Sequence, residues 1–441
     1  MTISIVLEFV VVLAAIWMGA RYSGVGLGLW GAVGLLVLVV AFGVNPTSPP
    51  IDVMLIILAV IMAASVMDAA GGIDFLVRIA ERIIRANPKY VTIVAPLTTW
   101  SFTFVAGTGH IVYPLLPVIY ETAHQSGIRP ERPMAIATSA SLQAITASPV
   151  AAATAAMIGL FAEKGMTQWG LPQILMICVP ATLTGVVAGA IISMFVGKDL
   201  AHDPAYQARL KAGEVPPAKA AADRPRLKPG AKTSAYIFLA GVALVVVFGF
   251  FPSLRTLPGE KSALAMPTVI EIVMLSVAAV MLLATKVHVD EVPKTATLRA
   301  GVVAVIGIFG LAWLGDSFIA ENKDVIVPAI GDWAKAAPWT FAFGLFFASV
   351  LLYSQAATTR ALMPLGIALG IPPQFLIAMF PSVNGYFFIP TYGSLIAAIN
   401  FDLSGTTKIG KYVLNHSFML PGLVATAVAV TTGLILAKAM F

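Results

Sequence analysis

The order of long apolar stretches constrains this chain more than any other feature, because a similar order occurs twice. Each half contains three apolar spans, then an apolar stretch that small polar residues interrupt, and then a span broken at a proline. Backbone groups at the depth of a bilayer must satisfy their own hydrogen bonds unless they line a cavity or are buried in protein. Interruptions in corresponding positions of two halves therefore predict a transport site.

The composition indicates an integral membrane protein. Of the 441 residues, 59% are hydrophobic and 11% are charged, whereas about 25% of the residues in a soluble domain are charged. The net charge of +6 does not imply binding to nucleic acid, because the basic residues lie in short loops, where they set membrane orientation. The single cysteine, Cys178, lies in an apolar span. The sequence contains no metal-ligand spacing, so we expect neither a metal nor a cofactor.

Ten stretches satisfy the requirement of about 20 mainly apolar residues for a membrane crossing. They are 3–19, 24–43, 51–70, 134–160 and 172–196 in the first half, and 234–251, 267–285, 299–318, 374–400 and 412–438 in the second. We expect an all-α membrane protein with about ten transmembrane helices plus two re-entrant hairpins, arranged in two inverted-topology repeats.

The two hairpins are predicted at 91–123 and 338–370, each with its polar interruption near the middle. Each stretch must begin and end on the same side of the membrane, and two full crossings would meet this requirement as well as a hairpin does. We prefer hairpins because no charged loop surrounds either interruption. Each repeat, 1–196 and 234–441, then has an odd number of crossings, which would invert the second repeat relative to the first.

Segment 197–233, rich in proline, alanine and charged residues, is the predicted cytoplasmic linker between the repeats. If the N-terminus lies outside, most of the 27 lysine and arginine residues lie on the cytoplasmic side, together with the linker. Because basic residues favour the cytoplasmic side, this bias predicts that both termini are external. A mobile connector is the simplest interpretation of the linker. The alternatives are contacts with anionic membrane lipid or with a regulatory sensor protein. The sequence also leaves a homodimer open.

The two hairpin tips supply the first candidates for a binding site. They are Gly107, Thr108, Gly109 and His110 in the first hairpin, and Ser354 and Gln355 in the second. The N-terminal end of a broken helix exposes free N–H groups and favours anions. Several such ends would suit a small molecule with two carboxylates, and the alternative is a packed kink without a ligand. Pro117 and Pro364 each lie ten residues after Gly107 and Ser354, which predicts that these two positions correspond.

The two broken spans supply further candidates at matched positions. These are Gln143, Ser148 and Pro149 in the first broken span, and Asn384, Pro390 and Thr391 in the second. Gln143 and Asn384 each precede their proline by six residues, and we expect both amides to face the same cavity as the tips. Hydrogen bonding between helices is the alternative role for them.

Arg360 and His110 are the two candidates that can carry charge. A charged side chain at the centre of a membrane helix costs about 2.5–3.5 kcal/mol on insertion scales, and a bidentate bond from Arg360 to a substrate carboxylate would offset that cost. Snorkelling or pairing with a protein carboxylate are the alternatives for Arg360. His110 could bind a carboxylate or take part in proton coupling, and a structural role is its alternative.

Five stretches resemble the anaerobic C4-dicarboxylate transporters of the Dcu family, A/B type. They are GGIDFLVRIAERIIRANPKYVTIVAP (71–96), GTGHIVYPLLPVIYE (107–121), GIRPERPMA (127–135), ASPV (147–150) and IPTYGSLIAAINFDLSGTTKIGKYVLNHSFMLPG (389–422). The resemblance implies exchange or uptake of fumarate, succinate, malate or aspartate across the bacterial inner membrane. In that membrane, the charge bias of the loops would place both termini in the periplasm. It also implies two inverted repeats with hairpins.

Other functions remain alternatives at this stage. A proton- or sodium-coupled carrier for another organic anion would have a similar pattern of spans, and so would a sensor that binds a dicarboxylate without moving it. The chain contains no reactive constellation of an enzyme, and we expect none of its activities to be catalytic.

Overall fold

The computed structural model describes residues 3–22, 24–215, 226–260 and 262–441. The helices that the text uses are α1 (Ile3–Tyr22), α2 (Gly26–Phe42), α3 (Ile51–Ala69), α4 (Gly72–Ala86), α5 (Val91–Ala106), α6 (Val112–Gln125), α7 (Glu131–Ile145), α8 (Ala152–Glu163), α9 (Leu171–Ser193), α10 (Pro204–Lys211), α11 (Ala231–Phe250), α12 (Met266–Thr285), α13 (Ala296–Ala336), α14 (Phe341–Leu352), α15 (Gln355–Ala368), α16 (Pro373–Met379), α17 (Gly393–Phe401) and α18 (Met419–Met440). Two isolated β-bridges, Thr256–Ala263 and Ile409–His416, are the only β-structure in the described residues.

The prediction of an all-helical membrane protein is confirmed. Six helices of the described chain are long and apolar enough to cross a membrane, and shorter apolar helices accompany them. The longest helix, α13, has 41 residues and runs well past the predicted span 299–318. The amphipathic helix α4 was not predicted, because its charged residues exclude it from a search for apolar spans.

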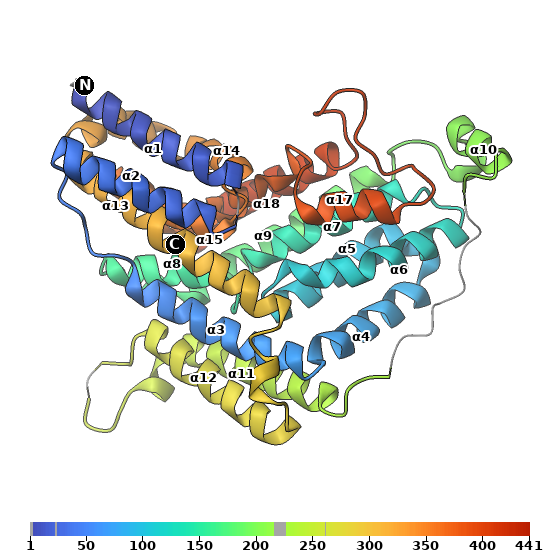
Figure 1. Cartoon of the computed structure of the whole chain (residues 1–441), viewed down its shortest axis with the longest axis horizontal. Coiled ribbons are helices and arrows are strands. Elements are labelled where there is room, and N and C mark those ends of the chain that lie inside the picture. The colour runs from blue at the N-terminus through green and yellow to red at the C-terminus, as the bar shows by residue number, and fades with distance from the viewer. Residues whose placement is uncertain (1–2, 23, 216–225, 261) are drawn as a thin grey trace.

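The long helices form a layered bundle in which α1, α2 and α13 lie side by side (Figure 1). Glycines allow α2 and α13 to approach closely: a Cβ atom on Gly28 would lie 1.9 Å from the carbonyl oxygen of Ile306. Small residues commonly permit such approaches between membrane helices. On the other side of the bundle, α12 packs against both α3 and α11.

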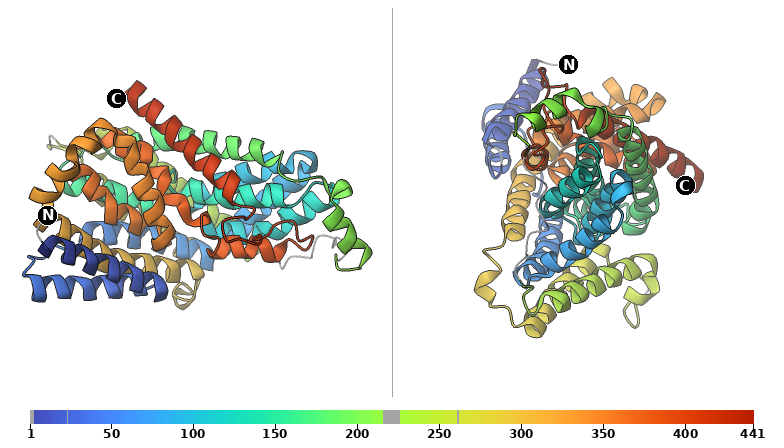
Figure 2. Two further views of the ribbon diagram at one scale, coloured as in Figure 1. Left: turned by 90° about the horizontal axis from the view of Figure 1, so that it is seen from above. Right: turned by 90° about the vertical axis from the view of Figure 1, so that its right-hand side faces the viewer.

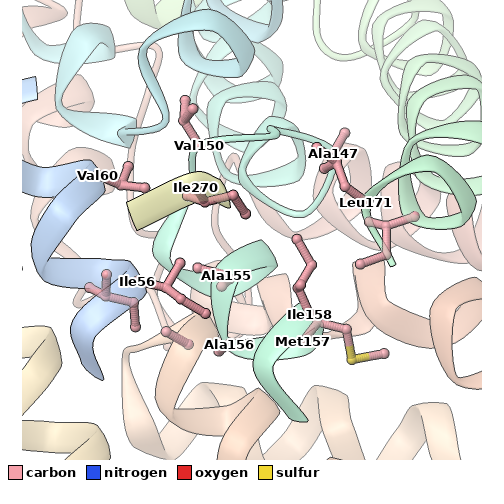
Figure 3. Close-up of a cluster of buried hydrophobic side chains, with 14 of the residues drawn as sticks. Ile56, Val60, Ala147, Val150, Ala155, Ala156, Met157, Ile158, Leu171 and Ile270 are labelled. Atoms are coloured by element: carbon pink, nitrogen blue, oxygen red, sulfur yellow. The ribbon is translucent and has the colours of Figure 1, made fainter. Parts of the chain in front are cut away.

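The predicted interruptions all coincide with breaks between short helices. The chain breaks between α5 and α6, between α7 and α8, between α14 and α15, and between α16 and α17. The half-helix α8 is buried on every side, as expected for a helix that is apolar all round. Figure 3 shows Ala155 and Ala156 of α8 beside Ile56 and Val60 of α3.

Two regions differ from the sequence prediction. The last predicted span began at residue 412, but α18 begins at Met419, because the preceding residues form a loop that the Ile409–His416 bridge closes. Part of the predicted linker forms α10, which is anchored and not a free connector. The Tyr206 hydroxyl of α10 lies 2.8 Å from His124 Nε2 on α6. The linker residues 216–225 lie outside the described residues.

Anchoring contacts also hold the two ends of α10. Arg129 pairs with Asp203, which caps the first turn of α10, and Arg209 donates to the carbonyl oxygen of Ser404 at 2.7 Å. Figure 2 shows that both chain termini lie toward the end of the molecule opposite to α10.

Candidate functional site

A cavity of about 260 Å³ lies where the two hairpin tips meet the start of α8. Its volume is slightly below the range of about 300–1,000 Å³ that is typical of pockets for drug-sized ligands, so it suits a small molecule. Six of the predicted site residues line the cavity: Gly107, Thr108, Gly109, His110, Ser354 and Gln355. Helices α2, α3 and α13 supply about half of the remaining lining residues, which are largely apolar.

The first tip turns through a left-handed residue. Gly107 has φ 69° and ends α5, and its N–H donates to the carbonyl oxygen of Thr103 at 2.8 Å. Glycine is required there for two reasons, since an added Cβ would lie 2.6 Å from the carbonyl oxygen of Val150 and since positive φ is costly for other residues. Thr108 follows in an extended conformation, and its hydroxyl accepts a hydrogen bond from the N–H of His110.

The second tip has the same order of backbone conformations, a left-handed residue followed by an extended one. Tyr353 ends α14 with φ 49°, and Ser354 follows in an extended conformation. The Ser354 hydroxyl caps α15 by accepting from the N–H of Ala357 at 3.2 Å. Thr108 therefore corresponds to Ser354, one residue away from the predicted match with Gly107. The turn that leads into α6 is the 3-10 turn Gly109–Ile111, which rises more per residue than an α-helix. Pro117 therefore follows Thr108 by nine residues, whereas Pro364 follows Ser354 by ten.

Two buried hydroxyls beneath the tips were missed by the sequence analysis. Thr103 and Ser349 each accept, through their carbonyl oxygens, the N–H of the left-handed residue four positions later. The Thr103 hydroxyl lies 2.8 Å from the Ser141 hydroxyl of α7, and the Ser349 hydroxyl accepts from the N–H of Gly385 at 2.8 Å. Each hydroxyl ties its tip to a broken span. A small hydroxyl residue one turn before each interruption is the signal that could have found them.

Four helix N-termini point toward the cavity, one from each break. Gly109 opens the turn into α6, Ala152 opens α8, Gln355 opens α15, and Tyr392 precedes α17. All four residues line the cavity. The first turn of a helix has N–H groups without intrahelical partners, and its dipole favours negative charge. The described lining of the cavity includes no lysine, arginine, aspartate or glutamate, so the polar groups that face it are neutral side chains, His110 and the backbone groups of the helix starts.

The two predicted amides lie behind the cavity and do not line it. Gln355 donates through Nε2 to Asn384 Oδ1 at 3.2 Å, and Asn384 donates through Nδ2 to Gln143 Oε1 at 3.3 Å. Gln143 donates in turn to the Thr426 hydroxyl at 2.9 Å. Gln143 and Asn384 are both buried. This chain of amides links the second tip to both broken spans, which is the interhelical role that the sequence left open.

The remaining predicted residues of the broken spans do not line the cavity, but they adjoin or bond to residues that do. The Ser148 hydroxyl is buried and accepts from the N–H of Val150 at 3.3 Å, and Val150 lines the cavity. Pro149 stands between them. Pro390 and Thr391 precede the cavity residue Tyr392, and the Thr391 hydroxyl bonds to the Tyr353 hydroxyl.

Arg360 is placed away from the cavity, which corrects the expectation that it meets the substrate. Its side chain is 1% exposed. Its guanidinium donates to Glu163 at 2.9 Å and to Asp316 at 3.1 Å. Arg360 lies six positions after Ser354, which places its Cα about 9 Å further along α15, out of reach of the tip. Both acids are distant in sequence, so the spacing of residues could not reveal them.

The whole chain matches known transporters. Residues 4–441 match the family described as anaerobic C4-dicarboxylate membrane transporters. The C4-dicarboxylate transporter DcuA of Escherichia coli K12 is 43% identical over 437 residues, which are 99% of this chain and 100% of that protein. DcuA of Wolinella succinogenes is 42% identical over 98% of this chain and 99% of that protein. The anaerobic C4-dicarboxylate transporter DcuB of Escherichia coli O6:H1 is 38% identical over 98% of each chain.

Two solved structures share the fold at low sequence identity. The YdaH transporter of Alcanivorax borkumensis has a TM-score of 0.53 at 15% identity, and the comparison covers 92% of this chain and 88% of that one. MtrF of Neisseria gonorrhoeae has a TM-score of 0.51 at 13% identity, over 93% and 85% of the two chains. The match along the entire sequence shows that this chain belongs to the family of anaerobic C4-dicarboxylate membrane transporters.

Proposed function

We propose that the chain moves C4-dicarboxylates such as fumarate, succinate, malate or aspartate across the bacterial inner membrane by alternating access. The observation that carries this proposal is the convergence of four helix N-termini on one cavity whose described lining holds no lysine or arginine. Two carboxylates offer enough acceptors for donors from both tips and both broken spans. The names of the relatives, which are C4-dicarboxylate transporters, support the same substrate class.

The pattern of helix packing supports two repeats, 1–196 and 234–441, joined by the linker 197–233. If α1, α2 and α3 correspond to α11, α12 and α13, exchange of the repeats converts the α2–α13 contact into the α12–α3 contact, and both contacts exist. The same exchange relates the contact of α7 with α9 to that of α16 with α18. The odd number of crossings in each predicted repeat would make the two copies antiparallel.

The breaks divide the helices into two functional groups in this proposal. The hairpins, the broken spans, α9 and α18 form a movable unit, and α1–α3 with α11–α13 form a support. Substrate carboxylates neutralise the positive potential of the helix ends. The occupied movable unit then crosses more readily than the empty one, which gives exchange.

The positions of the termini support a periplasmic location for both, because they lie toward the end opposite to α10 (Figure 2). The cytoplasmic side would then carry the linker and most of the basic residues. The exposed apolar faces of α1 and α12 suit contact with membrane lipid or with a second copy in a homodimer. The linker offers the surface on which a regulatory sensor protein would dock.

Counterflow of labelled fumarate in proteoliposomes tests the proposed activity. We expect labelled fumarate to enter vesicles that contain unlabelled succinate, and to enter poorly when the vesicles contain a monocarboxylate. Equal entry with either internal acid would contradict exchange of C4-dicarboxylates. Gly107→Ala serves as the matched variant, since it disturbs the tip and leaves every polar side chain in place.

A further inference from the structure

The two ends of the cavity are built from matched residues, but they differ at the left-handed position of each tip. Gly107 and Tyr353 both end the first helix of their hairpin with positive φ, 69° and 49°, and both line the cavity. Because glycine has no side chain, the first end presents backbone at this position, whereas the second end presents a phenol.

The same kind of replacement recurs at the breaks that the two tips face. Ala151 precedes α8 with φ −82° and ψ 146°, and Tyr392 precedes α17 with φ −70° and ψ 141°, so these two residues correspond. One position earlier, Val150 corresponds to Thr391. Three small or apolar residues of the first end are therefore matched by two tyrosines and a threonine at the second end.

Tyr353, Thr391 and Tyr392 form one contact group, which we call the aromatic end of the cavity. The Tyr353 hydroxyl is hydrogen-bonded to the Thr391 hydroxyl. The rings of Tyr353 and Tyr392 lie nearly parallel, with their centroids 6.3 Å apart. At the first end, an added Cβ on Gly107 would lie 2.6 Å from the carbonyl oxygen of Val150. Backbone therefore closes the first end, and side chains close the second.

Tyr353 holds its place against a conformational cost. It is one of two non-glycine residues with positive φ in the described chain, and a left-handed conformation is unfavourable for a residue with a Cβ. Residues that are held in such conformations are concentrated at binding and active sites. A glycine would avoid the cost, so the cost points to a use for the tyrosine side chain.

The hydroxyls of the aromatic end have acceptor capacity to spare. Each hydroxyl offers one proton and two lone pairs. Thr391 donates to the carbonyl oxygen of Ile389 at 3.4 Å, so in the bond between the two hydroxyls Tyr353 is the donor. Both protons are then used, and the free lone pairs of the Tyr353 oxygen remain. This end of the cavity therefore suits a ligand that carries a hydrogen-bond donor.

The carboxylates of the substrate cannot supply that donor, because ionised carboxylates only accept. An amino or hydroxyl group on the carbon next to a carboxylate can supply it. We propose that Tyr353 is a specificity-determining residue, whose hydroxyl accepts a hydrogen bond from the 2-amino group of aspartate or the 2-hydroxyl group of malate. This inference rests on the proposed function. The substituted half of the acid lies at the starts of α15 and α17, and fumarate and succinate bind through their carboxylates alone.

Competition against the uptake of labelled fumarate in proteoliposomes tests the proposal, with aspartate, malate and succinate as competitors. Tyr353→Phe removes the hydroxyl and keeps the ring. The half-inhibiting concentration of aspartate, divided by that of succinate, should rise about tenfold, because a hydrogen bond to a charged group is lost. The same ratio for malate should rise about threefold. Ratios cancel any change that the variant makes in the uptake of all acids alike.

Tyr386→Phe is the matched control, because it removes the same hydroxyl from a neighbouring ring. The ring centroids of Tyr386 and Tyr353 lie 6.2 Å apart. The Tyr386 hydroxyl is buried and makes no hydrogen bond in the structure, and Tyr386 is not among the described lining residues of the cavity. Both ratios should stay within about twofold of the unmodified chain, and thermal stability should not fall, because no hydrogen bond is lost.

Thr391→Val is a second variant, which keeps the test available if Tyr353→Phe does not fold. It removes the partner that orients the Tyr353 hydroxyl, so both ratios should rise in this variant as well. The measurement is the same competition series, with thermal unfolding in detergent as the check on folding.

The outcomes separate this inference from the proposed function. Unchanged ratios in Tyr353→Phe overturn the specificity role and leave dicarboxylate transport intact. An equal loss of affinity for aspartate, malate and succinate also overturns it, since that result shows a structural role. Fumarate uptake that neither aspartate nor malate inhibits in the unmodified chain has the same consequence. An unmodified chain that moves no fumarate refutes the proposed function, and the inference with it.

Discussion

The contact between the first tip and the α7–α8 break gives the sharpest mutational prediction. Gly107→Ala adds one methyl group at a residue with φ 69°, and this methyl would lie 2.6 Å from the carbonyl oxygen of Val150. The clash is with backbone, so no rotamer change can relieve it. The tip must move away from Val150, and the N-termini of α6 and α8 must separate.

The expected cost has two parts. A left-handed conformation costs a non-glycine residue about 1–2 kcal/mol, and overpacking typically costs about 1–3 kcal/mol. Gly107→Ala should therefore destabilise the protein by roughly 2–5 kcal/mol. About 1.4 kcal/mol corresponds to a factor of ten. If that part of the cost disfavours the tip geometry that binds fumarate, uptake of fumarate should fall at least tenfold.

Gly127→Ala is the matched control for this prediction. Gly127 has φ 70°, but an added Cβ would meet nothing within 4 Å. It should show only the conformational cost of about 1–2 kcal/mol, with uptake near that of the unmodified chain. Thermal unfolding in detergent and uptake in proteoliposomes report the two effects. Equal loss of stability and equal uptake in both variants would refute the proposed contact at Val150.

Three further predictions concern the second tip and the linker. Asn384→Ala leaves two buried amide partners unpaired, at about 1–3 kcal/mol each, and should raise the KM for fumarate; an unchanged KM would contradict the positioning role. Ser354→Ala should cost about 0.5–2 kcal/mol of stability and Ser354→Gly only a few tenths, as thermal unfolding would show. Burial raises the pKa of Asp203, but hydrogen bonds from the N–H of Tyr206 and from Arg129 lower it by more, so the pKa lies below its ordinary value. The stabilisation of the linker by Asp203 is therefore present above the pKa of the unfolded chain and is lost as pH falls through the folded value, so proteolysis of the linker should become faster in acid, with Asp203→Asn insensitive to pH.

Much of the site could be predicted because an interruption of a membrane helix is visible in the sequence as polar residues within an apolar stretch. A polar pair such as Gly107–Thr108 has no reason to stand in an apolar stretch unless the helix ends there. The positions of all four breaks followed from this rule. The residues at the two tips lie in one cavity for the same reason, since free helix ends at membrane depth must face a cavity or protein.

The partners of buried polar side chains could not be predicted in this way. Arg360 is paired with Glu163 and Asp316, and Asn384 with Gln143 and Gln355. These contacts join residues far apart in sequence, and hydropathy carries no information on which helices pack together. The docked position of α10 was missed for the same reason, because composition describes the polarity of a linker and not its partners.

A density map of the protein with bound fumarate tests the central claim most directly. The account predicts that the carboxylates of fumarate lie about 2.9 Å from backbone N–H groups at the starts of α6, α8, α15 or α17, with Arg360 still paired to its two acids. Fumarate held by Arg360, or by any lysine or arginine side chain in place of the helix ends, would contradict it.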